Sequence, residues 1–173
     1  MACKARHLFI VSLLFIASTI NGQNISKYYN SSLQGNGTLY FIFPQNGFNN
    51  NKINGKLTYD ITYLTTNDSA ILNFSYYEKL DRTIDSVAFI SGNQRFSSSA
   101  KKIFIETKKN KWHYRYSTSL LFKELNVFFS ATDDAKIILY TQQGTVELNI
   151  KTKIWKKQTS VTKKILTLIK YNQ

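Results

Sequence analysis

The chain has 173 residues, is 43% hydrophobic and carries a formal net charge of +13. This length suits one domain with a sizeable core. Its single cysteine, Cys3, excludes a disulfide framework and a zinc site built from several cysteines. Residues 101–173 contain 15 Lys and Arg against 5 Asp and Glu, whereas residues 23–100 contain 6 against 5. This asymmetry indicates an anionic partner, although a basic face that only keeps the protein in solution would give the same excess.

The first 22 residues have the pattern of a secretory signal peptide. Lys4 and Arg6 precede an apolar run at residues 8–20, and the chain then becomes polar. The run is shorter than the roughly 18 residues that a membrane anchor needs, so we expect cleavage near Gly22. We therefore predict an exported protein, periplasmic or extracellular, and a mature chain without thiols favours a bacterial source.

Residues 23–37 are polar and rich in turn-forming types, which predicts a flexible N-terminus of the mature chain. A single β-rich domain is expected over residues 38–173. Within it, alternation of apolar and polar residues predicts strands joined in hairpins. The predicted strands are residues 38–43, 56–66, 70–77, 84–91, 94–97, 101–107, 111–117, 136–141 and 145–154.

Two segments change to a helical period. Apolar residues at helical spacing behind Ser119 predict a short helix within residues 117–130. Ser160 precedes a second apolar stripe, which predicts a C-terminal amphipathic helix. The expected fold class is α+β and predominantly antiparallel β. We expect a hairpin-rich sheet or sandwich of about 8–9 strands with one inserted helix and one C-terminal helix.

The stretch KWHYRYS, residues 111–117, decides which surface is open to a partner. Its rings Trp112, Tyr114 and Tyr116 share one face and are expected to pack in the core with Ile103 and Ile105 of the facing strand. The opposite face is expected to be open to water. It would carry the cations Lys102, Lys108, Lys111, His113 and Arg115.

A second basic stretch lies at the end of the last predicted strand. Continued alternation sends Lys151, Lys153 and Trp155 outward, where the ring could stack on a sugar or base beside the cations. The alternative is that the chain bends at Ile154 and Trp155 packs against the terminal helix, which suits a large ring better. The candidate binding residues are therefore Lys111, His113, Arg115, Lys151, Lys153 and Trp155.

Catalytic and metal-binding patterns are weak. His113 is the single histidine after residue 22, and neither a Gly-x-Ser-x-Gly nor a His-Glu-x-x-His motif is present. We expect no catalytic residue of that kind, no metal site and no cofactor. Paired carboxylates could still hydrolyse a glycosidic bond. The candidate acids are Asp60, Glu78, Asp81, Asp85, Asp133 and Asp134.

The sequence favours a non-enzymatic exported binding or interaction domain with a basic polar face. The expected partner is an anionic surface or polymer, such as a polysaccharide, an envelope lipid or an acidic protein. Nucleic acid is not expected, and neither is a transmembrane segment in the mature chain. The alternatives are an envelope hydrolase that uses paired carboxylates and a subunit or inhibitor that pairs through an open sheet edge.

Overall fold

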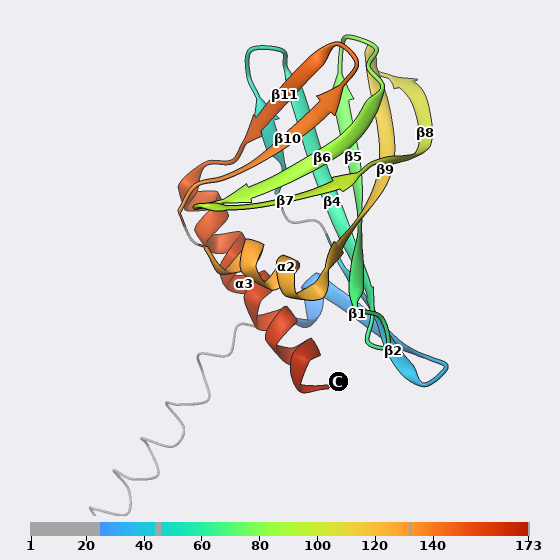
Figure 1. Cartoon of the computed structure of the whole chain (residues 1–173), viewed down its shortest axis with the longest axis vertical. Helices are drawn as coiled ribbons and strands as arrows, with labels where there is room; N and C mark the ends of the chain where they lie inside the picture. The colour runs from blue at the N-terminus through green and yellow to red at the C-terminus, as the bar shows by residue number, and fades with distance from the viewer. Residues whose placement is uncertain (1–24, 44–45, 132, 173) are drawn as a thin grey trace, which may run out of the picture.

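The computed structural model describes residues 25–43, 46–131 and 133–172. The predictions for residues 1–22 lie outside these ranges. The described chain forms one mostly antiparallel sheet, which curls until it is nearly closed, together with two α-helices (Figure 1). The predicted α+β, β-rich class with one inserted and one C-terminal helix is confirmed.

The elements follow the predicted order closely. A 3₁₀ helix, η1 (Ser26–Tyr28), precedes the strands β1 (Tyr29–Gln34), β2 (Gly37–Ile42), β3 (Phe48–Asn50), β4 (Gly55–Leu64), β5 (Ser69–Glu78), β6 (Ile84–Ser91), β7 (Gln94–Ser99), β8 (Lys101–Lys108), β9 (Lys111–Leu121), β10 (Ala135–Thr141) and β11 (Gly144–Asn149). The helices are α2 (Phe122–Ser130) and α3 (Thr152–Tyr171). The strand order is β7-β6-β10-β11-β3-β4-β5-β9-β8, and a β1–β2 ribbon pairs with β4 beside β3.

The two edge strands of this order, β7 and β8, are consecutive in the chain. Only Ala100 separates them. The Thr118 hydroxyl of β9 donates a hydrogen bond of 3.0 Å to the Ser99 carbonyl, so the end of β7 lies beside β9. Because one continuous segment runs from one edge to the other, the sheet has to curl until its edges approach each other.

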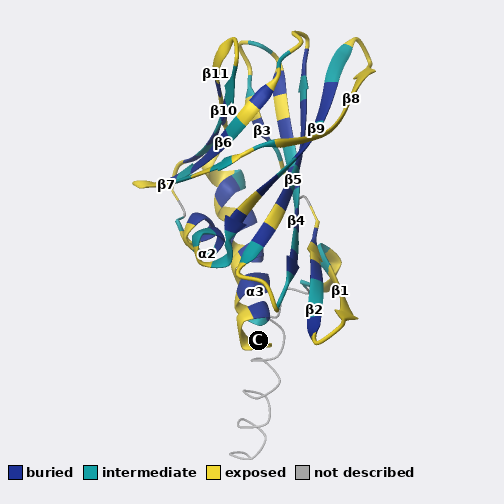
Figure 2. Ribbon diagram, turned by 45° about the vertical axis from the view of Figure 1, so that its right-hand side comes forward, coloured by how far each residue is buried: buried dark blue, intermediate teal, exposed yellow. Residues whose placement is uncertain are grey.

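The core lies inside the curled sheet and beneath the two helices (Figure 2). Alternation in β4 buries Leu57, Tyr59, Ile61 and Tyr63, as the period-two pattern predicts. Trp155 of α3 is fully buried among aromatic rings of other elements. Its ring centroid lies 5.9, 5.1 and 5.5 Å from those of Phe48, Phe128 and Phe129. Its Nε1 donates to the Ala131 carbonyl at 2.9 Å.

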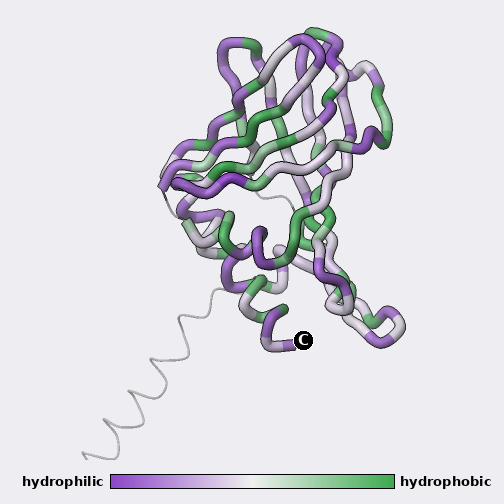
Figure 3. Tube along the Cα trace, in the orientation of Figure 1, coloured by the Kyte–Doolittle hydropathy of each residue, from purple (hydrophilic) through white to green (hydrophobic). Residues whose placement is uncertain are grey.

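The last predicted strand is too long and the terminal helix too short. β11 ends at Asn149, and α3 spans 20 residues from Thr152. The buried face of α3 contains Gln158, Thr159 and Thr162, so a search for apolar residues misses its first turns. The chain thus bends before Trp155, and the outward placement of this ring is wrong. Figure 3 shows the resulting alternation of hydrophilic and hydrophobic residues along α3.

The N-terminal segment is more regular than its composition suggests. Residues 23–37 are predicted to be loose, yet β1 occupies Tyr29–Gln34 and pairs with β2. Five of its six residues are exposed, so β1 is held by backbone pairing and leaves no apolar alternation to detect.

The inserted helix begins later than predicted. Ser119 is paired with Ile71 within β9 and does not cap a helix, because β9 continues to Leu121.

β8 is exposed at every position, which corrects the prediction for Ile103 and Ile105. Tyr114 and Tyr116 are buried as expected, but both isoleucines face solvent because β8 is an edge strand. The β8–β9 register shifts between Lys102 and Phe104. This bulge pairs Lys102 with Tyr116, which moves Lys102 off the outer face.

Across the described ranges, no helix is both long and apolar enough to cross a lipid bilayer.

Candidate anion-binding site

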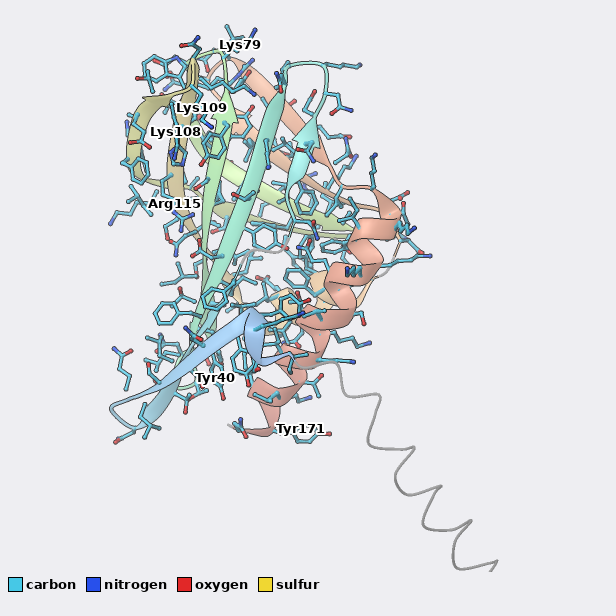
Figure 4. All side chains as sticks on the ribbon, turned by 180° about the vertical axis from the view of Figure 1, so that it is seen from behind. Tyr40, Lys79, Lys108, Lys109, Arg115 and Tyr171 are labelled. Carbon is cyan, nitrogen blue, oxygen red and sulfur yellow. The ribbon has the colours of Figure 1, made fainter. Side chains whose placement is uncertain are left out.

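The structure separates the predicted binding residues into two groups. Lys111, His113 and Arg115 lie on β9. Lys151 precedes α3, and Lys153 and Trp155 belong to it. Three strands, β3, β4 and β5, stand between β9 and β11 in the sheet order. Figure 4 accordingly shows Arg115 and α3 on different sides of the molecule. Lys151 and Lys153 are exposed, whereas buried Trp155 offers no stacking face.

His113 is not open to water as the alternation predicts. It is only 7% exposed. Its ring stacks on Tyr77 with centroids 4.3 Å apart, and Phe104 meets it edge-on at 5.1 Å. Its Nδ1 lies 2.8 Å from Glu106 Oε1, and its Nε2 is buried with no hydrogen-bond partner among the described residues. The prediction fails because neighbouring strands place rings on both sides of the imidazole.

Arg115 is half-buried, and its charge is paired with that of an acid. Its guanidinium forms an ion pair with Asp60 and donates to Ser75 Oγ at 3.1 Å. Asn73 Nδ2 donates to the other carboxylate oxygen of Asp60 at 3.2 Å. This side chain therefore links β9 to β5 and β4, and it leaves little charge for a ligand.

Beside His113 and Arg115, several lysines gather at the turn between β8 and β9. Lys109 and Asn110 form this two-residue turn with φ of 51° and 58°, the left-handed values of a type I′ turn. Asparagine and glycine adopt this conformation readily, whereas a lysine rarely does. Lys108 and Lys111 flank the turn, so three lysines project from four residues.

Two surface hollows, each of about 460 Å³, lie against this turn. One is lined by Lys56, Thr58, Tyr77, Lys108, Lys109 and Lys111. The other is lined by Lys79, Thr107, Lys108, Lys109, Asn110, Lys111 and Trp112. They share the turn lysines, and each has its own aromatic ring. We call this the lysine hairpin site, comprising Lys56, Tyr77, Lys79, Lys108, Lys109, Lys111 and Trp112.

The five lysines of the site are not neutralised by acids. Of the ion pairs formed among described residues, none includes any of them. Lys111 Nζ donates to the carbonyl and side-chain oxygens of Asn54, both at 3.0 Å, which orients it without cancelling its charge. In Figure 4, Lys79, Lys108 and Lys109 gather at one end of the molecule. Such a cluster attracts anions and repels other cations.

A buried polar network supports the loop that carries Lys79. Arg82 Nε donates to both oxygens of Glu78, at 3.0 and 2.9 Å, and the Tyr76 hydroxyl donates to Glu78 at 2.6 Å. The hydrogen bond to Glu78 raises the pKa of Arg82. Burial, followed by the contact with Glu78, raises the pKa of Tyr76 well above its ordinary value.

Tyrosine hydroxyls tie this loop to β9. The Tyr114 hydroxyl accepts from the Arg82 amide at 2.8 Å, and its single proton is shared between the Leu80 carbonyl at 3.0 Å and Asp81 Oδ1 at 3.1 Å. The Tyr116 hydroxyl accepts from the Ile84 amide at 3.1 Å. The loop is therefore held against β9, and Lys79 projects from a fixed base.

Sequence reasoning misses five residues of the site. Trp112 is predicted to pack in the core, yet it is only partly buried and lines one of the hollows. Lys56, Tyr77 and Lys79 lie on β4 and at the end of β5, and only the register of neighbouring strands brings them beside the turn. Lys109 falls in the segment predicted only as a short turn. The run KKNK indicates its unusual position, because the turn contains a single Asn and no Gly, so a lysine has to take the other central position.

Three of the six candidate acids of a hydrolase, Glu78, Asp60 and Asp81, are engaged in other contacts. Glu78 is 1% exposed, and both of its oxygens accept hydrogen bonds from Arg82. Asp60 is paired with Arg115, and Asp81 accepts from Tyr114. These contacts give the hydrolase hypothesis no specific support. Within the described ranges, no three His, Cys, Asp or Glu side chains are grouped so as to hold a metal ion.

Comparison with protein-family models, curated proteins and solved structures finds no match to this chain. The site therefore has to be interpreted from its own chemistry. That chemistry is positive charge without paired acids, placed around two hollows that each contain a ring.

Proposed function

We propose that the protein is an exported, non-enzymatic binding domain whose lysine hairpin site holds an acidic polysaccharide. The observation that carries this proposal is the convergence on two adjoining hollows of five lysines that form no ion pair with another described residue. The basic start and apolar run at residues 4–20 support export.

The two rings favour a sugar polymer over a small anion. An aromatic face packs well against the C–H groups of a sugar ring, while a lysine ammonium pairs with a uronate carboxylate. Tyr77 lines one hollow and Trp112 lines the other. Because the hollows share the turn lysines, a linear chain passing over the hairpin would occupy both of them.

The strained position of Lys109 supports the same conclusion. A residue other than glycine in the left-handed region costs about 1 kcal/mol or more. Asparagine at this position would reduce the strain but remove the charge. The chain therefore places a charged residue at the tip of the turn although asparagine would be less strained there. This choice is expected where the charge binds a ligand.

The decisive variant combines Lys108→Ala with Lys109→Asn. We expect it to fold with unchanged or higher thermal stability, because Asn suits the φ of 51° at position 109. Binding to polygalacturonate, measured by isothermal titration at low salt, should weaken by roughly tenfold as two charges are lost. The wild type should bind uncharged dextran far more weakly.

A matched control removes two lysines elsewhere. Lys156→Ala with Lys157→Ala changes the net charge by the same amount on α3, outside both hollows. This control should keep wild-type affinity for polygalacturonate. Wild-type protein that fails to bind polygalacturonate at low salt disproves the function. Equal losses in both variants disprove the site.

A further inference from the structure

The outer face of α3 is a second basic surface, separate from the lysine hairpin site. The exposed lysines of this helix are Lys153, Lys156, Lys157, Lys163, Lys164 and Lys170. Their spacings of three, four and seven residues place them on one face. At 1.5 Å per residue, they form a row about 25 Å long. We call this row the α3 lysine face.

The charge of this face is uncompensated. Residues 151–173 contain no Asp or Glu. None of the ion pairs that the structure describes involves a lysine of α3. The residues exposed between the lysines are Ser160 and Thr167, which add no charge. The face therefore presents six ammonium groups in succession.

The opposite face of α3 is buried, so the lysines have a fixed base. Trp155, Ile165 and Ile169 are fully buried. Asn172 Nδ2 donates to the Tyr40 hydroxyl at 3.1 Å and ties the helix end to β2. Only the lysine side of the helix is open to a partner (Figure 2).

The form of this face determines the kind of partner. It is the convex side of a helix, and its one large ring among the lysines, Trp155, is buried. All of its cations are lysines, which act as hydrated point charges and not as forks for a single carboxylate or phosphate. A straight convex row can bring all its charges close to a flat surface at once. Exposed Tyr171, at the end of the row in Figure 4, is of the type enriched at membrane interfaces.

We infer that the α3 lysine face binds the headgroup surface of an anionic lipid bilayer. Attraction between lysines and anionic headgroups adds up along the row and weakens as salt screens it. The lysine hairpin site, on a different side of the molecule, stays open to its polysaccharide while α3 lies on the membrane (Figure 4). This inference does not depend on the proposed function, because it concerns other residues and another partner.

The experiment is co-sedimentation of the full chain with vesicles of phosphatidylglycerol and phosphatidylcholine, compared with vesicles of phosphatidylcholine alone. The apolar run at residues 8–20 would favour both kinds of vesicle alike, so the difference between them reports the electrostatic part. We expect the wild type to partition at least roughly tenfold more strongly onto the anionic vesicles, and this preference to fall steeply with salt.

The test variant reverses four charges: Lys156→Glu, Lys157→Glu, Lys163→Glu and Lys164→Glu. All four side chains are exposed, so circular dichroism and thermal unfolding should show an intact fold. This variant should lose the preference for anionic vesicles but keep polygalacturonate binding. A control with Lys101, Lys108, Lys109 and Lys123 changed to Glu alters the same number of charges and should keep the preference.

Three results would overturn the inference. The wild type could show no preference for anionic vesicles at low salt. The α3 variant could retain the preference, or the control could lose it equally. If the α3 variant instead lost polygalacturonate binding while the wild type ignored vesicles, the face would belong to an acidic polymer and the lipid inference would be wrong.

Discussion

The lysine hairpin site and the α3 lysine face have similar composition but different construction. The hairpin projects from an exposed edge strand, and its neighbourhood is held by polar contacts such as the Glu78–Arg82 pair. α3 is anchored by its buried face, where Trp155 packs among Phe48, Phe128 and Phe129. The hairpin adjoins two hollows with rings, whereas α3 presents a convex row without them.

The difference shows that net charge alone does not define a partner. Nine of the 15 Lys and Arg of residues 101–173 lie on two surfaces of opposite shape. A concave basic site selects a ligand that can enter it, whereas a convex basic row responds to any extended anionic surface. The contacts that hold each surface in place can also be removed separately by substitution.

Replacing Trp155 by alanine should have the largest effect. Truncating a fully buried tryptophan leaves a cavity, and the Ala131 carbonyl loses its hydrogen bond. We expect the free energy of unfolding to fall by about 4 kcal/mol. Urea denaturation measures this loss. Trp155→Phe, which keeps a ring, should cost less than half as much, and a loss below about 1 kcal/mol for the alanine variant would show that α3 is not anchored there.

Replacing Glu78 by alanine should come next and should affect the hairpin side. The change leaves Arg82 without its counter-charge and the Tyr76 hydroxyl without its acceptor. We expect a loss of about 3 kcal/mol in the same assay, together with weaker polygalacturonate binding as the Lys79 loop loosens. Glu147→Ala breaks the exposed pair with Lys136 and should cost under about 1 kcal/mol. Equal losses in the two variants would contradict the role assigned to burial.

Much of the fold could be predicted because β4 buries every second residue, and β5 and β6 follow the same alternation over part of their length. Their alternation follows from the geometry of a pleated strand. β1 was not predicted, because five of its six residues are exposed and backbone pairing holds it. β8 was predicted as a strand, but the burial of Ile103 and Ile105 was wrong because the strand is exposed at every position. The start of α3 was not predicted to be helical, because its buried face there contains the polar residues Gln158, Thr159 and Thr162 and so lacks an apolar stripe.

The candidate site was only partly predictable for a related reason. Lys111 was identified from its own strand, but Lys56 and Tyr77 reach the site through the pairing of β4, β5 and β9. His113 and Arg115 are on the expected side of β9, but neighbouring strands already engage both side chains. Tyr77 stacks on the His113 ring, and Asp60 forms an ion pair with Arg115. Register across three strands depends on the whole sheet and cannot be read from any one of them.

Alkaline pH should test one tyrosine from each region. Tyr59 accepts a hydrogen bond from Gln158 of α3, and Tyr76 donates to Glu78 beneath the hairpin. Burial raises the pKa of both hydroxyls well above the ordinary value of about 10. The folded state therefore holds these protons more tightly than the unfolded state, so stability is complete below pH of about 10 and falls above it.

Each of these two tyrosines should contribute a loss of about 1.4 kcal/mol per pH unit above that point. Urea denaturation between pH 8 and 11 measures the slope. Tyr59→Phe and Tyr76→Phe should each remove about one such contribution. A slope unchanged by either buried substitution would show that these hydroxyls ionise as readily in the folded protein.

Lys153→Glu should have the smallest effect, and it should be a gain in stability. Lys153 lies in the first turn of α3, where no acidic residue is present and no side chain caps the helix. The helix dipole makes this end positive, so an acid there should stabilise the protein by about 0.5 kcal/mol and raise Tm by about 1–2 °C. Lys101→Glu, at an exposed strand position opposite Ser117 and without such a dipole, should leave Tm unchanged. A matching rise in both variants would mean that general repulsion among the lysines dominates. A rise in Lys153→Glu alone, with weaker binding to anionic vesicles, would show that the helix retains a cation at its unfavourable end for the sake of its partner.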